Sequence, residues 1–172
     1  MVINMIGLCG AGKTTIARAL SKHYHLPVVT IGEFRAKALK EVEQDGIRES
    51  LVAEVFAWLK FNEALIKRNL DGFIICTSGL NHRLEWILKE IRYLSKTISV
   101  KLVCGDRVLE KRVAQKKGRE PFCSDMDKSE FNKMMRPALK TTPADITIDT
   151  GRNSEAETIK KIIRKIGVLK MS

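Results

Sequence analysis

The stretch GLCGAGKTT, residues 7–15, decides the fold of this 172-residue chain. It follows a short apolar run, VINMI at 2–6, and opens the helical pattern KTTIARALSKHY at 13–24. The spacing matches G-x-x-x-x-G-K-[ST] without departure, and a strand before it and a helix after it are the context that this motif requires. Glycines let successive backbone N–H groups turn toward an anion, which the positive end of the following helix also attracts. The stretch therefore predicts a loop that binds the phosphates of a nucleoside triphosphate.

The side chains of this loop have separate expected roles. Lys13 reaches the β- and γ-phosphates, and this makes it a candidate catalytic residue. The Thr14 hydroxyl is the candidate metal ligand, because Mg²⁺ keeps several waters and bridges phosphate oxygens. ATP and Mg²⁺ are the cofactors that this arrangement predicts. The residues expected to bind the nucleotide are Gly7, Gly10, Ala11, Gly12, Lys13, Thr14 and Thr15.

The rest of the chain alternates between strand-like and helix-like segments. Strands are predicted at 2–6, 27–30, 73–76, 98–104 and 144–149. Helices are predicted at 13–24, after Gly32, at 48–69, 84–94 and 106–117, and at the C-terminal end, with a loop at 118–128. Strands that are apolar throughout belong in a parallel sheet covered on both faces. We therefore expect one α/β domain, a doubly wound parallel five-stranded sheet, with ligands at the carboxyl ends of its strands.

Composition limits the classes of partner and location. The formal net charge is +11, which favours anionic partners, but only 6% of residues are aromatic and they are not interleaved with the basic clusters, so we expect no nucleic-acid partner. No apolar window is long enough for a membrane span, and the first residues do not resemble a signal peptide, so we expect a cytoplasmic protein, monomeric or homodimeric. The cysteines, Cys9, Cys76, Cys104 and Cys123, form no CxxC pair, and we expect reduced, mostly structural thiols.

Two other classes of nucleotide-binding protein lack their expected residues here. A GTPase needs the guanine-reading sequence N-K-x-D, which this chain does not contain. A motor ATPase carries an acid at the end of a strand, whereas the run FIIC at 73–76 is followed by Thr77 and Ser78. The sequence thus favours an ATP-dependent kinase that moves the γ-phosphoryl group to a small acceptor.

Nearly the whole chain resembles the P-loop kinases of nucleotides and metabolites. GLCGAGKTTIARAL is similar to the opening of adenylylsulfate kinases, and VVTIGEFRAKALKE, from Val28, resembles the acceptor segment of adenylate and cytidylate kinases. IICTSGLNHRLEWIL, from Ile74, is similar to the third-strand segment of adenylylsulfate and gluconate kinases. LEKRVAQKKGRE, from Leu109, resembles the family's lid, and ADITIDTGRNSEAETIKKI, from Ala144, its last strand and helix.

This resemblance implies further site residues. Arg112 and Arg119 would lie in a lid at about 112–128 and neutralise charge on the transferring phosphoryl group, and Glu33 would be a catalytic acid that holds Mg²⁺-bound water or orients the acceptor oxygen. An acceptor-binding helical region would span about 32–69. The spacing from Glu33 to Arg35 is one residue shorter than the common pattern. The expected acceptor-binding residues are Gly32, Glu33, Arg35, Ser78 and Arg83.

The sequence is compatible with three functions. The segment from Val28 favours a nucleoside monophosphate kinase. The acid-free segment IICTSGL favours a kinase of a non-nucleotide or modified-nucleotide acceptor, such as adenylylsulfate, gluconate or dephospho-coenzyme A. The third is an ATP-binding regulatory or RNA-associated protein with little turnover. Arg35 could instead be a surface arginine, and Glu33 a first-turn residue favoured by the helix dipole. His82 fits a surface position better than the role of a general base.

Overall fold

The computed structural model describes residues 1–30, 34, 59–61, 63–64, 72–77, 97–115 and 128–171. Of the predicted acceptor-binding region at 32–69, it describes Phe34 and a few residues around Phe61. These two rings pack edge to face, with their centroids 5.5 Å apart. The Phe61 side chain is fully buried.

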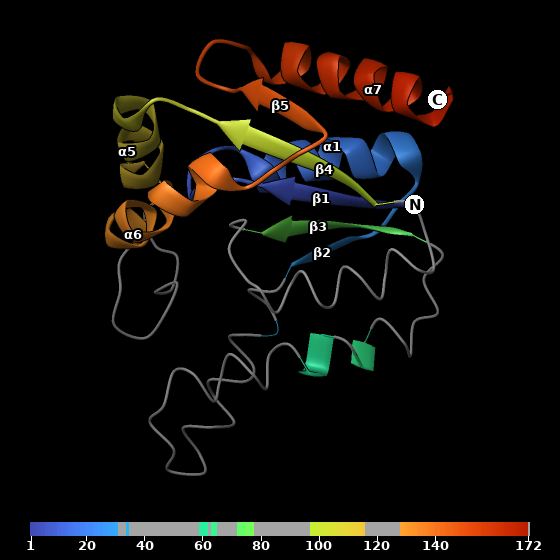
Figure 1. The fold of residues 1–172 in the computed structure, drawn as a ribbon, viewed down its shortest axis with the longest axis horizontal. Coiled ribbons are helices and arrows are strands. Elements are labelled where there is room, and N and C mark those ends of the chain that lie inside the picture. Colours follow the sequence, from blue (N-terminus) through green and yellow to red (C-terminus); the bar gives the residue numbers. More distant parts are fainter. Residues whose placement is uncertain are drawn as a thin grey trace.

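A five-stranded parallel sheet forms the centre of the molecule (Figure 1). The strand order is β2-β3-β1-β4-β5, and each neighbouring pair is parallel. The strands are β1 (Val2–Ile6), β2 (Val28–Thr30), β3 (Phe73–Thr77), β4 (Thr97–Val103) and β5 (Ile146–Asp149). The predicted doubly wound α/β sheet is confirmed, and every predicted strand is present with its bounds shifted by at most a residue or two.

The described part of the chain contains three of the predicted helices. These are α1 (Lys13–Tyr24), α5 (Asp106–Ala114) and α7 (Glu155–Met171). The start of α7 is held by a capping box, in which the Ser154 N–H and hydroxyl both donate to the Glu157 carboxylate, and the Glu157 N–H donates back to the Ser154 hydroxyl. These bonds hold the pKa of Glu157 below its ordinary value.

A further helix, α6 (Lys128–Thr141), was not predicted. Its signal is present in the sequence, because Phe131, Met135 and Leu139 are spaced four residues apart and all are buried. Pro137 lies inside the helix and hides this pattern, since proline is rare in helix interiors. Lys101 of β4 fastens the end of α6: its ammonium group donates to the carbonyls of Leu139 at 3.4 Å and Thr142 at 2.7 Å.

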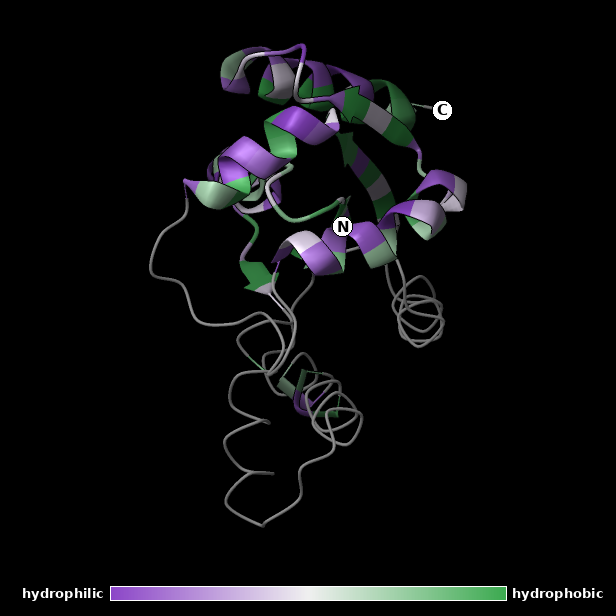
Figure 2. Ribbon diagram, turned by 90° about the vertical axis from the view of Figure 1, so that its left-hand side faces the viewer, coloured by the Kyte–Doolittle hydropathy of each residue, from purple (hydrophilic) through white to green (hydrophobic). Residues whose placement is uncertain are grey.

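The core lies between the sheet and the helices that pack on it. Every residue of β1 and β3 is buried, and the apolar side of α1, formed by Ile16, Ala17 and Leu20, packs into the same cluster. Figure 2 shows hydrophobic and hydrophilic residues interspersed along the helices, as an amphipathic helix requires. This amphipathic pattern explains why α1 and α7 form where the periodicity predicts them.

All strands end at one edge of the sheet, and α5 and α6 lie at this edge (Figure 1). The GLCGAGKTT loop leaves β1 there, and it is joined to the end of β3 because the Gly7 N–H donates to the Thr77 carbonyl at 3.2 Å. The Thr77 hydroxyl in turn donates to the Asn4 side chain in the middle of β1 at 3.0 Å. The functional site is therefore built on rigid, buried strands.

Candidate active site

The GLCGAGKTT loop has the backbone that a phosphate-binding loop requires. Gly10 and Gly12 have φ values of 87° and 92°, which other residues adopt only at a cost. Gly12 is the N-cap of α1, so the positive end of that helix faces the loop, and Lys13 and Thr14 are its first residues. The backbone thus fits the phosphates of a nucleotide, and the part-buried Thr14 hydroxyl lies where it could hold Mg²⁺.

Lys13 folds back over the loop that it follows. Its ammonium group donates to the Gly7 carbonyl at 2.7 Å and to the Leu8 carbonyl at 2.9 Å. Two charge-assisted hydrogen bonds therefore fix the position of the cation beside the loop backbone before any substrate arrives. This preorganisation is the form of electrostatic stabilisation that phosphoryl transfer depends on.

The charge of Lys13 also affects the pKa of Cys76, near the end of β3. Burial raises the pKa of the Cys76 thiol to about 11, while the charge of Lys13 lowers it to a smaller extent. The thiol is therefore protonated at neutral pH and is a poor nucleophile. This agrees with the expectation that the cysteines are mainly structural.

A cavity of about 310 Å³ lies next to the loop, between the start of α1, the end of α5 and the start of α7. Its volume is at the lower end of the range of roughly 300–1,000 Å³ for small-molecule sites. Polar residues at or just before the start of α7, Asn153, Glu155 and Thr158, contribute to its lining. The lining residues are Gly10, Ala11, Gly12, Thr15, Ile16, Arg112, Gln115, Thr150, Asn153, Glu155 and Thr158.

Thr150, directly after β5, joins this cavity to the phosphate-binding loop. Its hydroxyl donates to the Ala11 carbonyl at 3.1 Å, and its carbonyl accepts from Arg112 Nη2 at 2.9 Å. Arg112 Nη1 donates to the Thr150 hydroxyl at 3.1 Å. The sequence predicts ligands at the carboxyl ends of the strands but does not single out Thr150, whose only signal is its position directly after β5.

Helix α6 also supports the loop. The side-chain amide of Asn132 binds both backbone polar groups of Cys9, and Arg136 lies one turn further along the same helix. Arg136 forms an ion pair with Asp106 at the start of α5. Sequence reasoning missed both residues because it missed the helix.

The structure thus brings together the predicted nucleotide-binding residues at 7–15 and Arg112. The other predicted site residues lie outside the described part of the chain, as does His82. Those site residues are Gly32, Glu33, Arg35, Ser78, Arg83 and Arg119. Among the described residues, no three His, Cys, Asp or Glu side chains converge on a possible metal site.

The shikimate kinase family model matches residues 9–167 of this chain. The chain belongs to the shikimate kinase family. The shikimate kinase of Bacillus mycoides is 29% identical over 170 residues, which are 95% of this chain and 97% of that protein. The signal recognition particle 54 kDa protein of Staphylothermus marinus is 27% identical over 110 residues, which are 56% of this chain but only 25% of that protein.

Solved structures share the fold. A shikimate kinase from Acinetobacter baumannii in complex with shikimate has a TM-score of 0.67 at 19% identity, covering 99% of this chain and 95% of that one. A gluconokinase from Sinorhizobium meliloti has a TM-score of 0.62 at 17% identity, covering 98% of this chain and 92% of that one.

Family membership confirms that this protein is an ATP-dependent small-molecule kinase that uses Mg²⁺. The predicted relation to the P-loop kinases is confirmed as well. The third function considered above, an ATP-binding regulatory or RNA-associated protein with little turnover, is therefore not retained. Bound Mg²⁺ would supply positive charge to the phosphates, and the loop backbone, Lys13 and Thr14 are the parts of this chain that would hold the nucleotide and the metal.

Replacing Arg112 by methionine is expected to weaken ATP binding about tenfold, because the cavity loses a cation and Thr150 loses two charged donors. Equilibrium titration with ATP measures this, and kcat at saturating ATP should change far less. Lys111→Met, on an exposed neighbour in α5, is the matched control. A large fall in kcat at unchanged ATP affinity would instead assign Arg112 to charge neutralisation during transfer, as the resemblance to a lid implies.

Proposed function

We propose that the phosphate acceptor is a hydroxylated carboxylate of the shikimate class. The observation that carries this proposal is the family match, because it extends from residue 9 in the phosphate-binding loop to residue 167 in α7. The relative from Bacillus mycoides, which this chain matches over almost its whole length, is a shikimate kinase. The nucleoside monophosphate acceptor rested on the segment from Val28, of which the structure describes residues 28–30 and 34.

A cation suited to a carboxylate lies on α6. Arg136 is partly buried, with 31% of its side chain exposed, and its Nε atom is buried without a hydrogen-bond partner among the described residues. A buried, unpaired guanidinium N–H is costly unless a ligand satisfies it. Arginine also binds carboxylates through two parallel hydrogen bonds, which orients the bound molecule as well as holding it.

The proposed reaction is transfer of the γ-phosphoryl group to an acceptor hydroxyl. The hydroxyl oxygen forms a bond to the γ-phosphorus, the bond from that phosphorus to the β–γ bridging oxygen breaks, and the hydroxyl proton is released. Lys13 and the loop N–H groups would hold the phosphates and spread their charge, and Arg136 would hold the acceptor carboxylate. Such transfer depends mainly on positioning and charge, so it does not require a strong base.

A coupled ADP-release assay tests the acceptor. Shikimate, gluconate, AMP, CMP, adenylylsulfate and dephospho-coenzyme A are compared with ATP and Mg²⁺ held constant. We expect kcat/KM for shikimate to exceed the others by at least about 10²-fold, because a site built to bind specific hydroxyl groups rejects molecules that lack them. Lys13→Ala protein shows how much turnover comes from contaminating kinases. If turnover with AMP or CMP exceeds turnover with shikimate, the protein is a nucleoside monophosphate kinase and the proposed acceptor is wrong.

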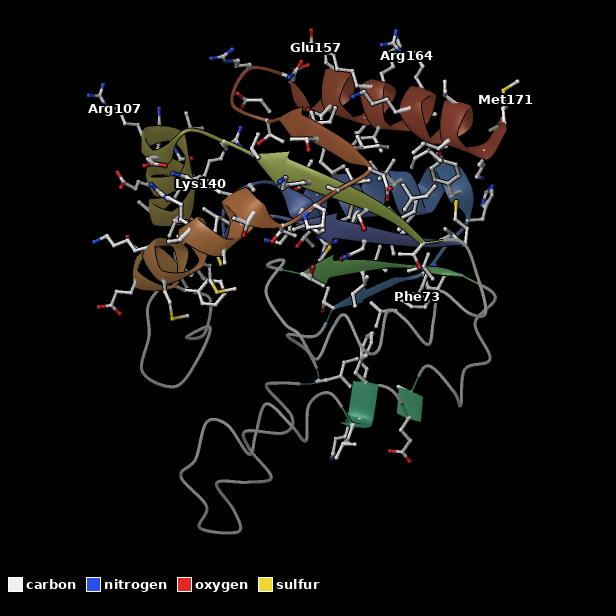
Figure 3. All side chains as sticks on the ribbon, in the orientation of Figure 1. Phe73, Arg107, Lys140, Glu157, Arg164 and Met171 are labelled. Atoms are coloured by element: carbon white, nitrogen blue, oxygen red, sulfur yellow. The ribbon has the colours of Figure 1, made fainter. Side chains whose placement is uncertain are left out.

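Other expectations from the sequence stay proposals. They include the lid at about 112–128, the acceptor-binding region at 32–69, and the roles of Gly32, Glu33, Arg35, Ser78, Arg83 and Arg119. A cytoplasmic location, a monomeric or homodimeric state and the lack of a nucleic-acid partner belong with them. In the described ranges, no helix has the length and apolar character to cross a membrane. Figure 3 shows Arg107 and Arg164 extending outward from α5 and α7, so part of the basic charge lies on outer helix surfaces.

A further inference from the structure

Asn132 of α6 is bound to the middle of the phosphate-binding loop. Its Oδ1 accepts from the Cys9 N–H at 2.8 Å, and its Nδ2 donates to the Cys9 carbonyl at 3.0 Å. The donor and acceptor of Cys9 face opposite ends of the amide, so the orientation of the Asn132 side chain is determined. Only 5% of Asn132 is exposed, and Cys9, which supplies both hydrogen-bond partners, lies 123 positions away in the sequence.

The packing of α6 does not itself require an amide at this position. Phe131, Met135 and Leu139 already bury the apolar side of the helix in the core. A buried amide is unfavourable unless its hydrogen bonds are made, so its two bonds to Cys9 offset that cost without adding to the apolar packing. The effect of these bonds is on the loop, because they hold the N–H and the carbonyl of Cys9 in a single orientation.

The held residue occupies a decisive place in the loop. Cys9 follows Gly7 and Leu8, whose carbonyls accept from Lys13, and it precedes Gly10, whose φ of 87° turns the chain toward the helix. A change in the backbone of Cys9 would therefore displace both the partners of Lys13 and the following N–H groups. A loop held in its binding shape loses less conformational freedom when a ligand binds.

We propose that Asn132 is a positioning residue that holds the phosphate-binding loop in its ATP-binding shape. It acts through Cys9 and touches no reacting atom. The same helix carries Arg136 one turn later, so α6 also sets the position of the loop relative to that cation. This inference concerns ATP binding alone, and it stands whether or not the acceptor is shikimate.

Two variants of Asn132 test the proposal. Asn132→Leu keeps the branched shape of the side chain and removes both hydrogen bonds, while Asn132→Asp keeps an acceptor for the Cys9 N–H and removes the donor. The matched control is Lys101→Met, which removes two hydrogen bonds that go to the other end of α6 and not to the loop. Each protein is measured for ATP affinity by titration, for the KM of the acceptor, for melting temperature, and for amide hydrogen exchange of residues 7–12.

For Asn132→Leu we expect ATP affinity to fall about tenfold, with exchange accelerated in residues 7–12 and the acceptor KM within about twofold. For Asn132→Asp we expect the Cys9 amide to stay protected while ATP affinity falls, because a carboxylate then faces the Cys9 carbonyl. Lys101→Met should lower the melting temperature without changing loop exchange or ATP affinity.

The proposal is overturned if Asn132→Leu leaves both ATP affinity and loop exchange unchanged. It is also overturned if Lys101→Met weakens ATP binding equally at the same loss of melting temperature, since general loosening of α6 would then explain the effect. If the leucine variant fails to fold, unchanged ATP affinity in Asn132→Asp also overturns the proposal. Loss of shikimate turnover with normal ATP binding would count against the proposed acceptor and not against Asn132.

Discussion

Alanine in place of Lys13 is expected to lower kcat by about 10²- to 10³-fold while the fold stays intact. The ammonium group is held by the Gly7 and Leu8 carbonyls at the start of the loop, where charge on the phosphates must be neutralised. The Lys13→Ala variant lacks this positive charge, and nothing in the reaction supplies another cation at that position. The loss should appear in kcat as well as in ATP affinity, because negative charge shifts during transfer.

This substitution should lower the free energy of unfolding without preventing folding. Lys13 is part-buried and its two hydrogen bonds are each worth about 1–3 kcal/mol at most, so cooperative unfolding should persist at a moderately lower temperature. Lys22→Ala, on an exposed lysine in the last turn of α1, removes the same charge from the same helix away from the loop and should leave kcat unchanged. Retention of more than about a tenth of wild-type kcat in Lys13→Ala would refute the catalytic role of Lys13.

Methionine in place of Arg136 is expected to raise the KM for shikimate by about 10- to 10²-fold, with little change in ATP affinity. Two charge-assisted hydrogen bonds to the carboxylate would be lost, each of which can contribute about 1.5–3 kcal/mol. Arg136→Lys should restore only part of the affinity, because an ammonium group keeps the charge but lacks the planar pair of donors. Steady-state kinetics with each substrate varied in turn measure this difference.

The ion pair between Arg136 and Asp106 offers a way to separate binding from structure. Asp106→Asn removes the partner of Arg136 and keeps the cation, so shikimate affinity should be largely retained. Lys133→Met, on an exposed lysine of α6, controls for loss of positive charge on this helix. If Asp106→Asn and Arg136→Met raise the KM equally, Arg136 acts by holding α5 and α6 together and does not bind the acceptor.

Local patterns were sufficient to predict most of the fold. The buried runs at 2–6 and 73–76 could only pair inside a sheet, and the periodicity of 13–24 and of the C-terminal segment specified the faces of α1 and α7. Helix α6 shows the limit of this approach. Pro137 lowers the helical propensity of a segment whose apolar residues nevertheless pack against the core, and that packing outweighs the local preference.

By itself the sequence determined the phosphate-binding loop and its neighbours in the chain, because the glycines, Lys13 and Thr14 act within one turn of backbone and its following helix. Tertiary structure alone decided which distant groups support that loop. Thr150 reaches Ala11, and Asn132 reaches Cys9, across separations of 139 and 123 residues. Such pairs leave no spacing signal, since they depend on parallel strands bringing β1, β4 and β5 to one edge and on α6 packing beside it. The physical reason is that a hydrogen bond needs a distance and a direction, which only the assembled fold specifies.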